Sequence, residues 1–416
     1  MDEQKRLRKR LSRLGKKTTR SKSPPGARKA HSESDRFGEP VETPHGPAFL
    51  IEERYPLEHI HGNRHLGEYF GYNAQLAAEI ARDASLAEVD LARLLFVDTE
   101  TTGLVGGAGT IAFLIGVGAF EGNDFVLRQF FLHDPAEETA MLYLLDSQID
   151  SSEGFVSFNG RVFDIPLVEM RFRISLRKRL SLTSWPHLDL LFPARRLWKR
   201  ELPDCSLGTL ERSVLGVQRS GEDVPGEWIP GIYLDYLRTG DLSELKRVVY
   251  HNRVDILSLV GLSVEILSRH QIDAISDLTG AEALGVARWH EGAGRGKSAE
   301  NAYRAAVESD DKGIRVEALR HWTAHLKRGG QRQLAVEAWE YWYELAQDDP
   351  RPCVELAKYY EWHLKDLERA ADWSQQALMC LSHWSSGWRR EQVWGEIQHR
   401  ISRIAHKRAR ADSSKR

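Results

Sequence analysis

The sequence predicts an α/β chain in which a mixed β-sheet with flanking helices precedes an all-α region of repeated helices. Three observations support this order. Between residues 91 and 270, short apolar runs alternate with segments that carry apolar residues at helical spacing. Beyond residue 281, helical segments recur at nearly constant spacing and carry most of the twelve tryptophans. Residues 1–47, by contrast, are rich in Lys, Arg, Ser, Gly and Pro and contain few apolar residues.

The first 47 residues are expected to form a disordered basic tail, because so few apolar side chains cannot offset the entropy of an ordered chain. Residues 1–30 hold twelve Lys or Arg and two acids, although the whole chain has a net charge of −2. This tail is either a solvated segment or an arm that binds the phosphates of a polyanion. Residues 48–90 mix short apolar pieces with loops and are expected to pack as an extension on the α/β domain.

The α/β domain is predicted to cover residues 91–270. Three strands come first, and the turn "EGND" joins the second to the third. They are "LARLLFV" (91–97), "TIAFLIGVGAF" (110–120) and "DFVLRQFFL" (124–132). A helix that begins with Pro and acids is predicted at 135–149, before a short strand at 154–160. Further helices are predicted at 164–174, 206–216 and 243–267.

Repeated helices are predicted for residues 281–400, followed by a basic tail at 401–416. Segments around Ala299, Ala335 and Ala370 superpose at spacings of 36 and 35 residues, and each follows another amphipathic stretch. Small residues at close helix contacts, with aromatic residues filling the gaps, suit a stack of helical hairpins. The region therefore resembles tetratricopeptide repeats. An ordinary helical bundle is the alternative, because the full repeat signature is absent.

Cysteine usage and hydropathy indicate the compartment. The three cysteines, Cys205, Cys353 and Cys380, form no CxxC motif, which argues against both a disulfide framework and a cysteine zinc site. The longest strongly apolar stretch, residues 111–120, is too short for a bilayer, which needs about 20 residues. The basic N-terminus lacks the apolar segment of a secretory signal. We therefore expect a cytoplasmic protein without a membrane partner.

Two carboxylates close the first predicted strand, in the stretch "LLFVDTETTG" at 94–103. Because side chains alternate along a strand, Asp98 and Glu100 project to one side and Thr99 to the other. An acidic pair at the end of a buried strand is costly unless it is neutralised. Hard oxygen ligands without cysteine favour Mg²⁺ or Mn²⁺ over zinc. The alternative is a loop that carries two solvated acids.

Two later segments each contribute another acid. "SFNGRVFDIPLV" places Asp164 near the start of a predicted helix, after a turn at Asn159. "YHNRVDILSL" places His251 and Asp255 four residues apart, on one face of a helix. Taken singly, an acid near a helix start is usually a cap, and a His/Asp pair at this spacing is usually a surface contact.

In this order, the three segments resemble the motifs of the DEDD superfamily of 3′→5′ exonucleases, which have a ribonuclease H-like fold. "DTETTG" resembles the first motif, "FNGRVFD" the second and "HNRVD" the third, over about residues 91–270. The glycine-rich stretch after "DTETTGL", together with "AFLIGVG", "HLDLL" and the repeats, resembles the YprB-type ribonuclease H-like proteins of bacteria. The resemblance implies a ribonuclease H-like mixed sheet with flanking helices, followed by an all-α tetratricopeptide-like repeat domain.

The resemblance also implies a metal-dependent 3′→5′ exonuclease that hydrolyses DNA by a two-metal-ion mechanism in bacterial DNA repair. Two Mg²⁺ or Mn²⁺ ions would be held by four carboxylates, those of Asp98, Glu100, Asp164 and Asp255. A helicase or another protein would be the partner of the repeats. An RNA-processing exonuclease and a non-catalytic nucleic-acid-binding scaffold remain alternatives. No motif reads a 2′-hydroxyl, and the repeats could serve as an interaction platform.

The general base departs from the superfamily pattern. One subclass has a tyrosine with three residues between it and the last Asp, and the other has a histidine with four. Here Tyr250 has the histidine spacing and His251 has the tyrosine spacing. On a helix, His251 lies about 40° from the face of Asp255, and Tyr250 lies about 140° away. Imidazole also titrates near neutral pH, so we predict His251 as the base.

Other residues near the motifs are predicted to support the site. Substrate contacts are predicted for Thr99, Thr101, Gly103, Asn159, Arg161 and Tyr250. Asp189, in "HLDLL", either holds a substrate end, supports the acids from behind, or forms a local cap or salt bridge. A basic cluster, which either contacts phosphates or is solvated, consists of Arg161, Arg195, Arg196, Lys199 and Arg200.

Overall fold

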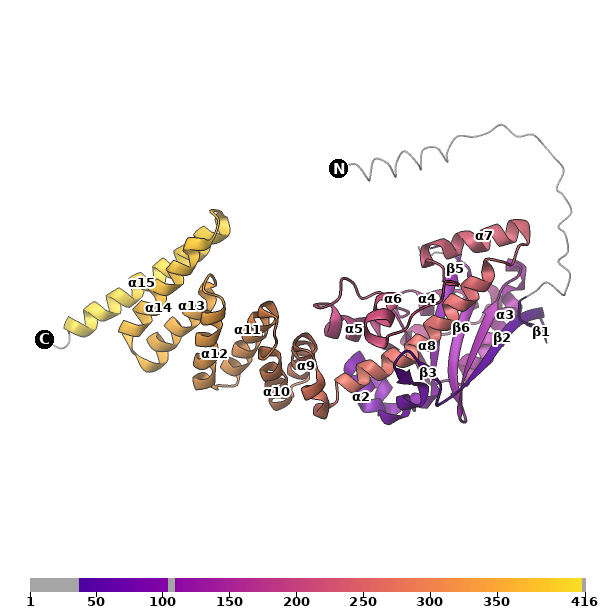
Figure 1. The fold of residues 1–416 in the computed structure, drawn as a ribbon, viewed down its shortest axis with the longest axis horizontal. Coiled ribbons are helices and arrows are strands. Elements are labelled where there is room, and N and C mark those ends of the chain that lie inside the picture. The colour runs from indigo at the N-terminus through magenta and orange to yellow at the C-terminus, as the bar shows by residue number, and fades with distance from the viewer. Residues whose placement is uncertain (1–36, 104–108, 414–416) are drawn as a thin grey trace, which may run out of the picture. The chain divides into compact units, whose positions relative to one another are not determined.

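The structure is a computed structural model that describes residues 37–103 and 109–413. The predicted tail at residues 1–36 lies outside the described residues. From Phe37 onward, the described residues form one compact unit. An α/β part precedes an all-α part in this unit, as the sequence predicts (Figure 1).

Seven of the nine strands in the described residues form one mixed sheet. The strands are β1 Glu39–Thr43, β2 Gly46–Pro56, β3 Ile60–His61, β4 Arg64–His65, β5 Leu94–Thr101, β6 Ala112–Glu121, β7 Asp124–Phe131, β8 Gly154–Ser157 and β9 His187–Asp189. The order in the sheet is β1-β2-β7-β6-β5-β8-β9. β8 is parallel to both β5 and β9, and the other neighbours are antiparallel. The carboxyl ends of β5, β8 and β9 therefore meet at one edge of the sheet.

β1 and β2 extend the sheet where the sequence predicts no strand. β1 and the start of β2 lie within residues 1–47, which were expected to be disordered, so the structured part begins earlier than predicted. β2 pairs with β7 from Phe49 opposite Phe131 to Pro56 opposite Asp124. This stretch is thus part of the sheet rather than an extension that packs on it. Its backbone partners are distant in sequence, so its composition does not reveal them.

The helices of the α/β part flank this sheet, and α8 crosses it (Figure 1). They are α2 Ala74–Ala81, α3 Glu138–Asp150, α4 Asp164–Arg171, α5 Leu191–Trp198, α6 Leu207–Leu210, α7 Ile229–Thr239 and α8 Leu245–Arg269. α8 contacts β5, β6 and β7. The glycines of "IGVG" on β6 allow this close approach, since a Cβ at Gly118 would lie 2.9 Å from Ile256 of α8.

The all-α part consists of helices that pair in sequence order. They are α9 Gly280–Gly292, α10 Gly296–Val307, α11 Lys312–Arg328, α12 Arg332–Leu345, α13 Pro350–Tyr359, α14 Leu367–Cys380 and α15 Trp388–Ser413. α9 contacts α10, α11 contacts α12, and α13 contacts α14, as the repeat prediction requires. Ala299, Ala335 and Ala370 are all fully buried. α15 continues through residue 400, where a tail was predicted to begin, and ends at Ser413.

α15 is tied to the preceding helices by a buried carboxylate. Glu361 lies in a π-helical turn, Tyr360–Leu364, and its side chain has no exposed surface. It accepts hydrogen bonds from Arg400 at 3.1 Å, from Arg403 at 2.8 and 3.0 Å, and from Lys407 at 2.7 Å. Burial by itself would raise the pKa of Glu361, but the hydrogen bonds from Arg403 and Lys407 lower it to about 2.

Glu361→Gln should destabilise the protein by about 3 kcal/mol, because it leaves three cations around a neutral side chain. Because the pKa of Glu361 is lower in the folded state, its carboxylate contributes its full stabilisation at pH values above the unfolded pKa of about 4.5. This stabilisation is lost as the pH falls toward 2. Denaturant unfolding at pH 7 measures the change. Glu368→Gln, which removes an exposed partner of Arg408, is the control and should change stability by less than about 0.5 kcal/mol. Equal effects of the two variants would contradict the anchoring role.

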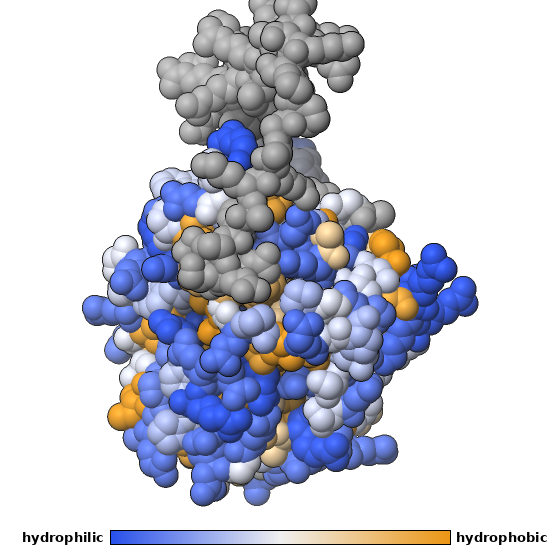
Figure 2. All heavy atoms as spheres, turned by 90° about the vertical axis from the view of Figure 1, so that its right-hand side faces the viewer, coloured by the Kyte–Doolittle hydropathy of each residue, from blue (hydrophilic) through white to orange (hydrophobic). Residues whose placement is uncertain are grey.

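In the part of the chain that the structure describes, no helix is long and apolar enough to cross a membrane. The face shown in Figure 2 is mainly hydrophilic, and hydrophobic residues appear on it in small separate groups.

Candidate active site

β5 delivers the first two acids to the edge where the parallel strands end. Residues 94–97 are buried, and the strand then emerges at Asp98 and Glu100. Asp98 lies opposite Gly116 of β6, and the register shifts directly after Glu100. The ladder is thus irregular just where the carboxylates are presented, and it resumes with Thr101 opposite Ala112. Beyond it, the Thr101 hydroxyl donates a hydrogen bond to the carbonyl of Gly103 at 2.8 Å.

The third acid, Asp164, is the first residue of α4 and follows β8 through a tight loop. Asn159 adopts a left-handed conformation in this loop, with φ of 67°. The Thr99 hydroxyl donates to Asp164 Oδ1 at 2.5 Å. Thr99 thus holds the third acid beside the strand that carries the first two, although the sequence predicted a substrate contact for it.

Asp189 holds the loop of the second motif in place. It is buried at the end of β9 and accepts hydrogen bonds from the backbone amides of Asn159 at 2.8 Å and Arg161 at 3.2 Å. Its Oδ1 also accepts from the backbone amide of Leu191 at 3.1 Å. Of the three roles that the sequence left open for Asp189, these contacts fit two: a local cap at Leu191, and support of the acids from behind through the loop of the second motif. The side chain of Arg161 itself binds Asp83 at 2.6 Å and the carbonyl of His187 at 2.9 Å.

α8 brings the fourth acid and the histidine to the same place. Asp255 is 8% exposed. His251 Nε2 lies 3.6 Å from Asp255 Oδ2 and 3.9 Å from Glu100 Oε1. Tyr250 points elsewhere: its hydroxyl accepts a hydrogen bond from the backbone amide of Ser220 at 2.9 Å. The guanidinium of Arg253 lies 5.2 Å from the centre of its ring.

Three charged residues that the sequence did not single out surround His251 and Asp255. Arg219 pairs with Asp255, and it binds Glu211 at 2.6 and 2.7 Å. Asp223 Oδ1 lies 2.8 Å from His251 Nδ1, and Arg219 Nη1 lies 2.9 Å from the same nitrogen. A guanidinium only donates, so a hydrogen bond from Arg219 requires an unprotonated Nδ1. Donation from Nδ1 to Asp223 instead leaves a lone pair on Nε2, the ring nitrogen that faces the acids.

Asp98 is oriented by a polar row across the sheet. The Asn252 amide donates to Asp98 Oδ2 at 2.8 Å, and Gln129 donates to Asn252 Oδ1 at 2.8 Å. Asp98, Gly116 and Gln129 lie side by side on β5, β6 and β7. Asn252 is fully buried and sits over Gly116, where a Cβ would overlap its side chain. The absence of a side chain at Gly116 therefore makes room for the amide that orients Asp98.

Gly116→Ala should displace Asn252 and lower stability by about 1–3 kcal/mol, because the overlap forces the side chain or the backbone to move. The cleavage activity that the resemblance implies should fall together with the loss of the hydrogen bond to Asp98. Thermal unfolding and a nuclease assay measure the two effects. Gly231→Ala is the control: it lies in α7, and a Cβ there meets open space, so the protein should become slightly more stable. Wild-type activity in Gly116→Ala would show that Asn252 does not position Asp98.

The four acids repel one another in a buried setting. Burial, followed by the charges of Asp255 and Asp164, raises the pKa of Asp98 well above its usual range. Burial and the other three acids do the same to the pKa of Glu100. Burial raises the pKa of Asp164 to about 6, although the hydrogen bond from Thr99 opposes the shift. Burial also raises the pKa of Asp255, against the influence of His251 and Arg219.

A divalent cation fits the chemistry of this donor set. Four carboxylates without a thiolate suit Mg²⁺ or Mn²⁺, and a cation would relieve the repulsion that raises their pKa values. Within residues 37–103 and 109–413, no three His, Cys, Asp or Glu side chains are gathered closely enough to hold one ion. A guanidinium, that of Arg219, supplies the positive charge next to Asp255.

Comparisons with known proteins show what the chain is similar to. The sequence profile of the RNase_H superfamily matches residues 95–267. An uncharacterized protein of Bacillus subtilis strain 168, YprB, is 30% identical over 372 residues, which cover 86% of this chain and 86% of that protein. A family B DNA polymerase of the archaeon Pyrobaculum calidifontis is 17% identical, with a TM-score of 0.33. That match covers 57% of this chain and 29% of the polymerase.

Proposed function

Because the chain belongs to the YprB family within the ribonuclease H superfamily, we propose that it is a metal-dependent 3′→5′ exonuclease that hydrolyses DNA. Family membership supports a nuclease, a hydrolase that acts on nucleic acid. The polarity of cleavage, the preference for DNA and the metal dependence are our proposal. They rest on the order of the three acidic motifs and on the residues that these motifs bring together.

One observation carries the proposal: four acids from three separate segments lie close enough for their charges to interact, and two of them, Glu100 and Asp255, face His251. β5 supplies Asp98 and Glu100, α4 supplies Asp164, and α8 supplies Asp255. The pKa of each of the four carboxyl groups is raised. The site therefore retains carboxylates that repel one another, and this repulsion lowers the stability of the fold. A scaffold that only bound nucleic acid would gain nothing from such a cluster. This cost therefore favours a catalytic site.

Each residue then has a role in hydrolysis. Asp98, Glu100, Asp164 and Asp255 would hold two Mg²⁺ or Mn²⁺ ions, which would supply a nucleophilic water and charge stabilisation at the phosphate. His251 Nε2 would accept the proton of the attacking water, while Asp223 fixes its Nδ1.

The substrate contacts that the sequence predicted have local partners in the structure. Thr99, Thr101 and the backbone of Asn159 are engaged in the hydrogen bonds that shape the loops around the acids. We propose that Gly103, Asn159, Arg161 and Tyr250 contact the substrate from the rim of the site, with Asn159 using its side chain because its backbone groups are engaged within the protein.

The biological setting that we propose is DNA repair in the bacterial cytoplasm. The three cysteines are free thiols, which suits a reducing compartment. The helices α9 to α15 would form tetratricopeptide-like repeats that bind a protein partner, such as a helicase that exposes single strands.

A direct assay tests the activity. Purified protein is incubated with 5′-labelled single-stranded DNA, duplex DNA and matched RNA, with Mg²⁺ or Mn²⁺, and with a strand blocked at its 3′ end. A ladder that shortens from a free 3′ end supports the proposal. Cleavage of the 3′-blocked strand would indicate an endonuclease, and preference for the RNA would indicate RNA processing. No metal-dependent cleavage of any polymer would favour a scaffold.

A further inference from the structure

A basic cavity lies where the α/β part meets the helical part, away from the four acids. Its volume is about 500 Å³, and residues from α5, α9 and α11 surround it, together with residues that directly follow α2 and α5. Six cationic side chains line it, and Glu317 is the single acid in its lining. The six are Arg82, Arg195, Arg196, Lys199, Arg200 and Arg288.

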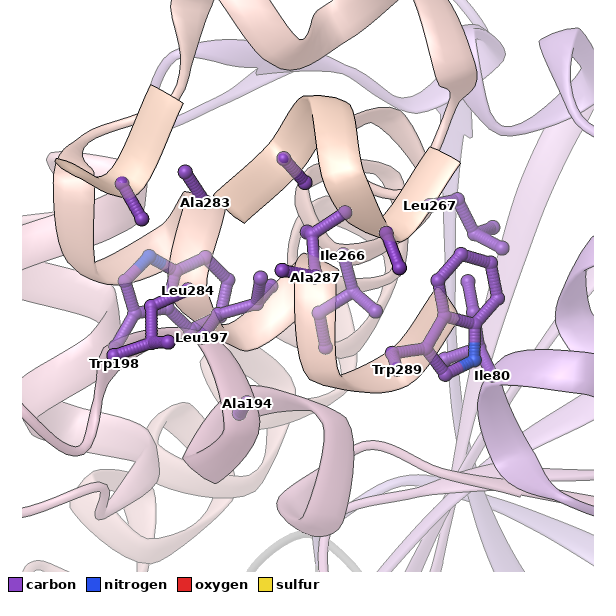
Figure 3. Close-up of a cluster of buried hydrophobic side chains, with 14 of the residues drawn as sticks. Ile80, Ala194, Leu197, Trp198, Ile266, Leu267, Ala283, Leu284, Ala287 and Trp289 are labelled. Carbon is purple, nitrogen blue, oxygen red and sulfur yellow. The ribbon is translucent and has the colours of Figure 1, made fainter. Parts of the chain in front are cut away.

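The walls of this cavity are fixed by a shared hydrophobic core. Figure 3 shows side chains of α5, α8 and α9 packed together, among them Leu197, Ile266 and Leu284. α9 approaches α5 so closely that a Cβ at Gly285 would overlap the carbonyl oxygen of Arg196. The Trp198 indole donates to Glu282 of α9 at 2.7 Å. The cationic side chains are therefore presented by a packed junction rather than by a loose linker.

Most of the positive charge in the cavity is uncompensated. Arg200 pairs with Glu317 at 2.8 Å. Among the residues that the structure describes, no carboxylate pairs with the other five cations. Arg196 instead donates to the carbonyl of Ile80 at 3.4 and 3.5 Å. Burial, followed by the nearby charge of Arg82, lowers the pKa of Arg196 to about 10. Such a concentration of guanidinium groups in a hollow attracts a polyanion.

The cavity is linked to the candidate active site through two short connections. Arg82 lines the cavity, and the next residue, Asp83, accepts the hydrogen bond from Arg161 in the loop of the second motif. α5 supplies Arg195 and Arg196, and Lys199 and Arg200 follow it directly. This helix begins two residues after Asp189, the last residue of β9. Since neighbouring strands lie about 4.8 Å apart, β9 is only about 10 Å from β5.

We propose that this cavity binds the sugar–phosphate backbone of the nucleic acid, several nucleotides from the end that is cleaved. The inference rests on the proposed function and extends it with a second binding site. Arg195 and Lys199 are four residues apart, and Lys199 caps α5, so this pair presents two cations about one helical turn apart. Arg82 and Arg288 add cations from other walls. Cations spread in this way suit successive phosphates of one strand better than a single small anion.

Binding of a labelled 30-nucleotide single strand to the full chain, measured by fluorescence anisotropy in EDTA, tests the proposal without cleavage. Arg195→Gln/Arg288→Gln removes two exposed cations and should raise the Kd about tenfold or more near 0.1 M salt. The slope of log K against log salt should become shallower by about 1.4, since each phosphate contact on a single strand contributes about 0.7. Arg195→Lys/Arg288→Lys should keep the wild-type slope.

The controls separate this proposal from the proposed function. Arg332→Gln removes an exposed arginine on α12 outside the cavity and should bind like wild type. A metal-dependent assay on a dinucleotide should be unaffected by the double substitution, because so short a substrate cannot reach the cavity. If neither the wild type nor any variant cleaves a substrate, the proposed function fails. The binding comparison would still show whether the cavity binds nucleic acid.

Two results would overturn the inference. One is wild-type affinity and salt slope for the 30-nucleotide strand in Arg195→Gln/Arg288→Gln, with the fold unchanged by circular dichroism. The other is loss of tripolyphosphate binding in that variant while oligonucleotide binding stays intact. The second result would identify the cavity as a site for a small anion.

Discussion

Asp98→Asn should lower cleavage at least about a thousandfold and leave the metal-free protein as stable as wild type, or more stable. A thousandfold loss corresponds to about 4 kcal/mol of transition-state stabilisation. Asparagine keeps the shape of Asp98 and can still receive the hydrogen bond from Asn252. It removes one of four charges whose mutual repulsion and burial raise their pKa values, so it removes a cost of folding. Single-turnover cleavage and thermal unfolding in EDTA measure the two effects.

The same variant also reports on the metal. A divalent ion that binds the folded wild type should raise its melting temperature, and this increase should shrink in Asp98→Asn. Asp150→Asn, which removes an exposed carboxylate on α3, should change neither the activity nor the response to Mn²⁺. Loss of activity together with a marked loss of stability in EDTA would show instead that Asp98 is needed for the fold.

The central part of the fold can be predicted from sequence because its elements carry local signals. β5, β6 and β7 are apolar runs, with a clear turn between β6 and β7, and α8 has long helical periodicity. β1 and β2 lack such signals. They become strands by pairing with each other and with β7, and the pairing determines which side of each strand is buried. Ala299, Ala335 and Ala370 are all buried, as small residues at close helix contacts would be.

The acids of the site can be predicted because they lie in short sequence motifs. Most of the groups that orient these acids lie outside such motifs. Asn252 and Gln129 come together only through the register of three strands and the crossing of α8. Arg219 and Asp223 lie in a loop whose composition is that of any polar loop, yet they reach Asp255 and His251. Long-range packing sets these contacts, and no local pattern in the chain encodes them.

The assignment of the general base leads to the second large effect. His251→Ala should lower kcat by about 10²–10⁴-fold, the usual contribution of a positioned base, while Tyr250→Phe should stay within a few-fold of wild type. His251 Nε2 faces Glu100 and Asp255, whereas the Tyr250 hydroxyl is occupied by the amide of Ser220. Single-turnover rates at saturating Mn²⁺ measure the chemical step without the influence of substrate release.

The geometry also predicts an intermediate result that separates a base from a structural histidine. Asp223→Asn should keep the fold and reduce the rate less than His251→Ala, because it weakens the hydrogen bond that fixes Nδ1 but leaves the imidazole in place. Mn²⁺ should bind His251→Ala about as tightly as wild type, since the four carboxylates remain. A large loss in Tyr250→Phe with near-normal rates in His251→Ala would reverse the assignment. In that case Tyr250 would have to leave Ser220 and turn toward the acids when substrate binds, a movement that the contact with Arg253 opposes.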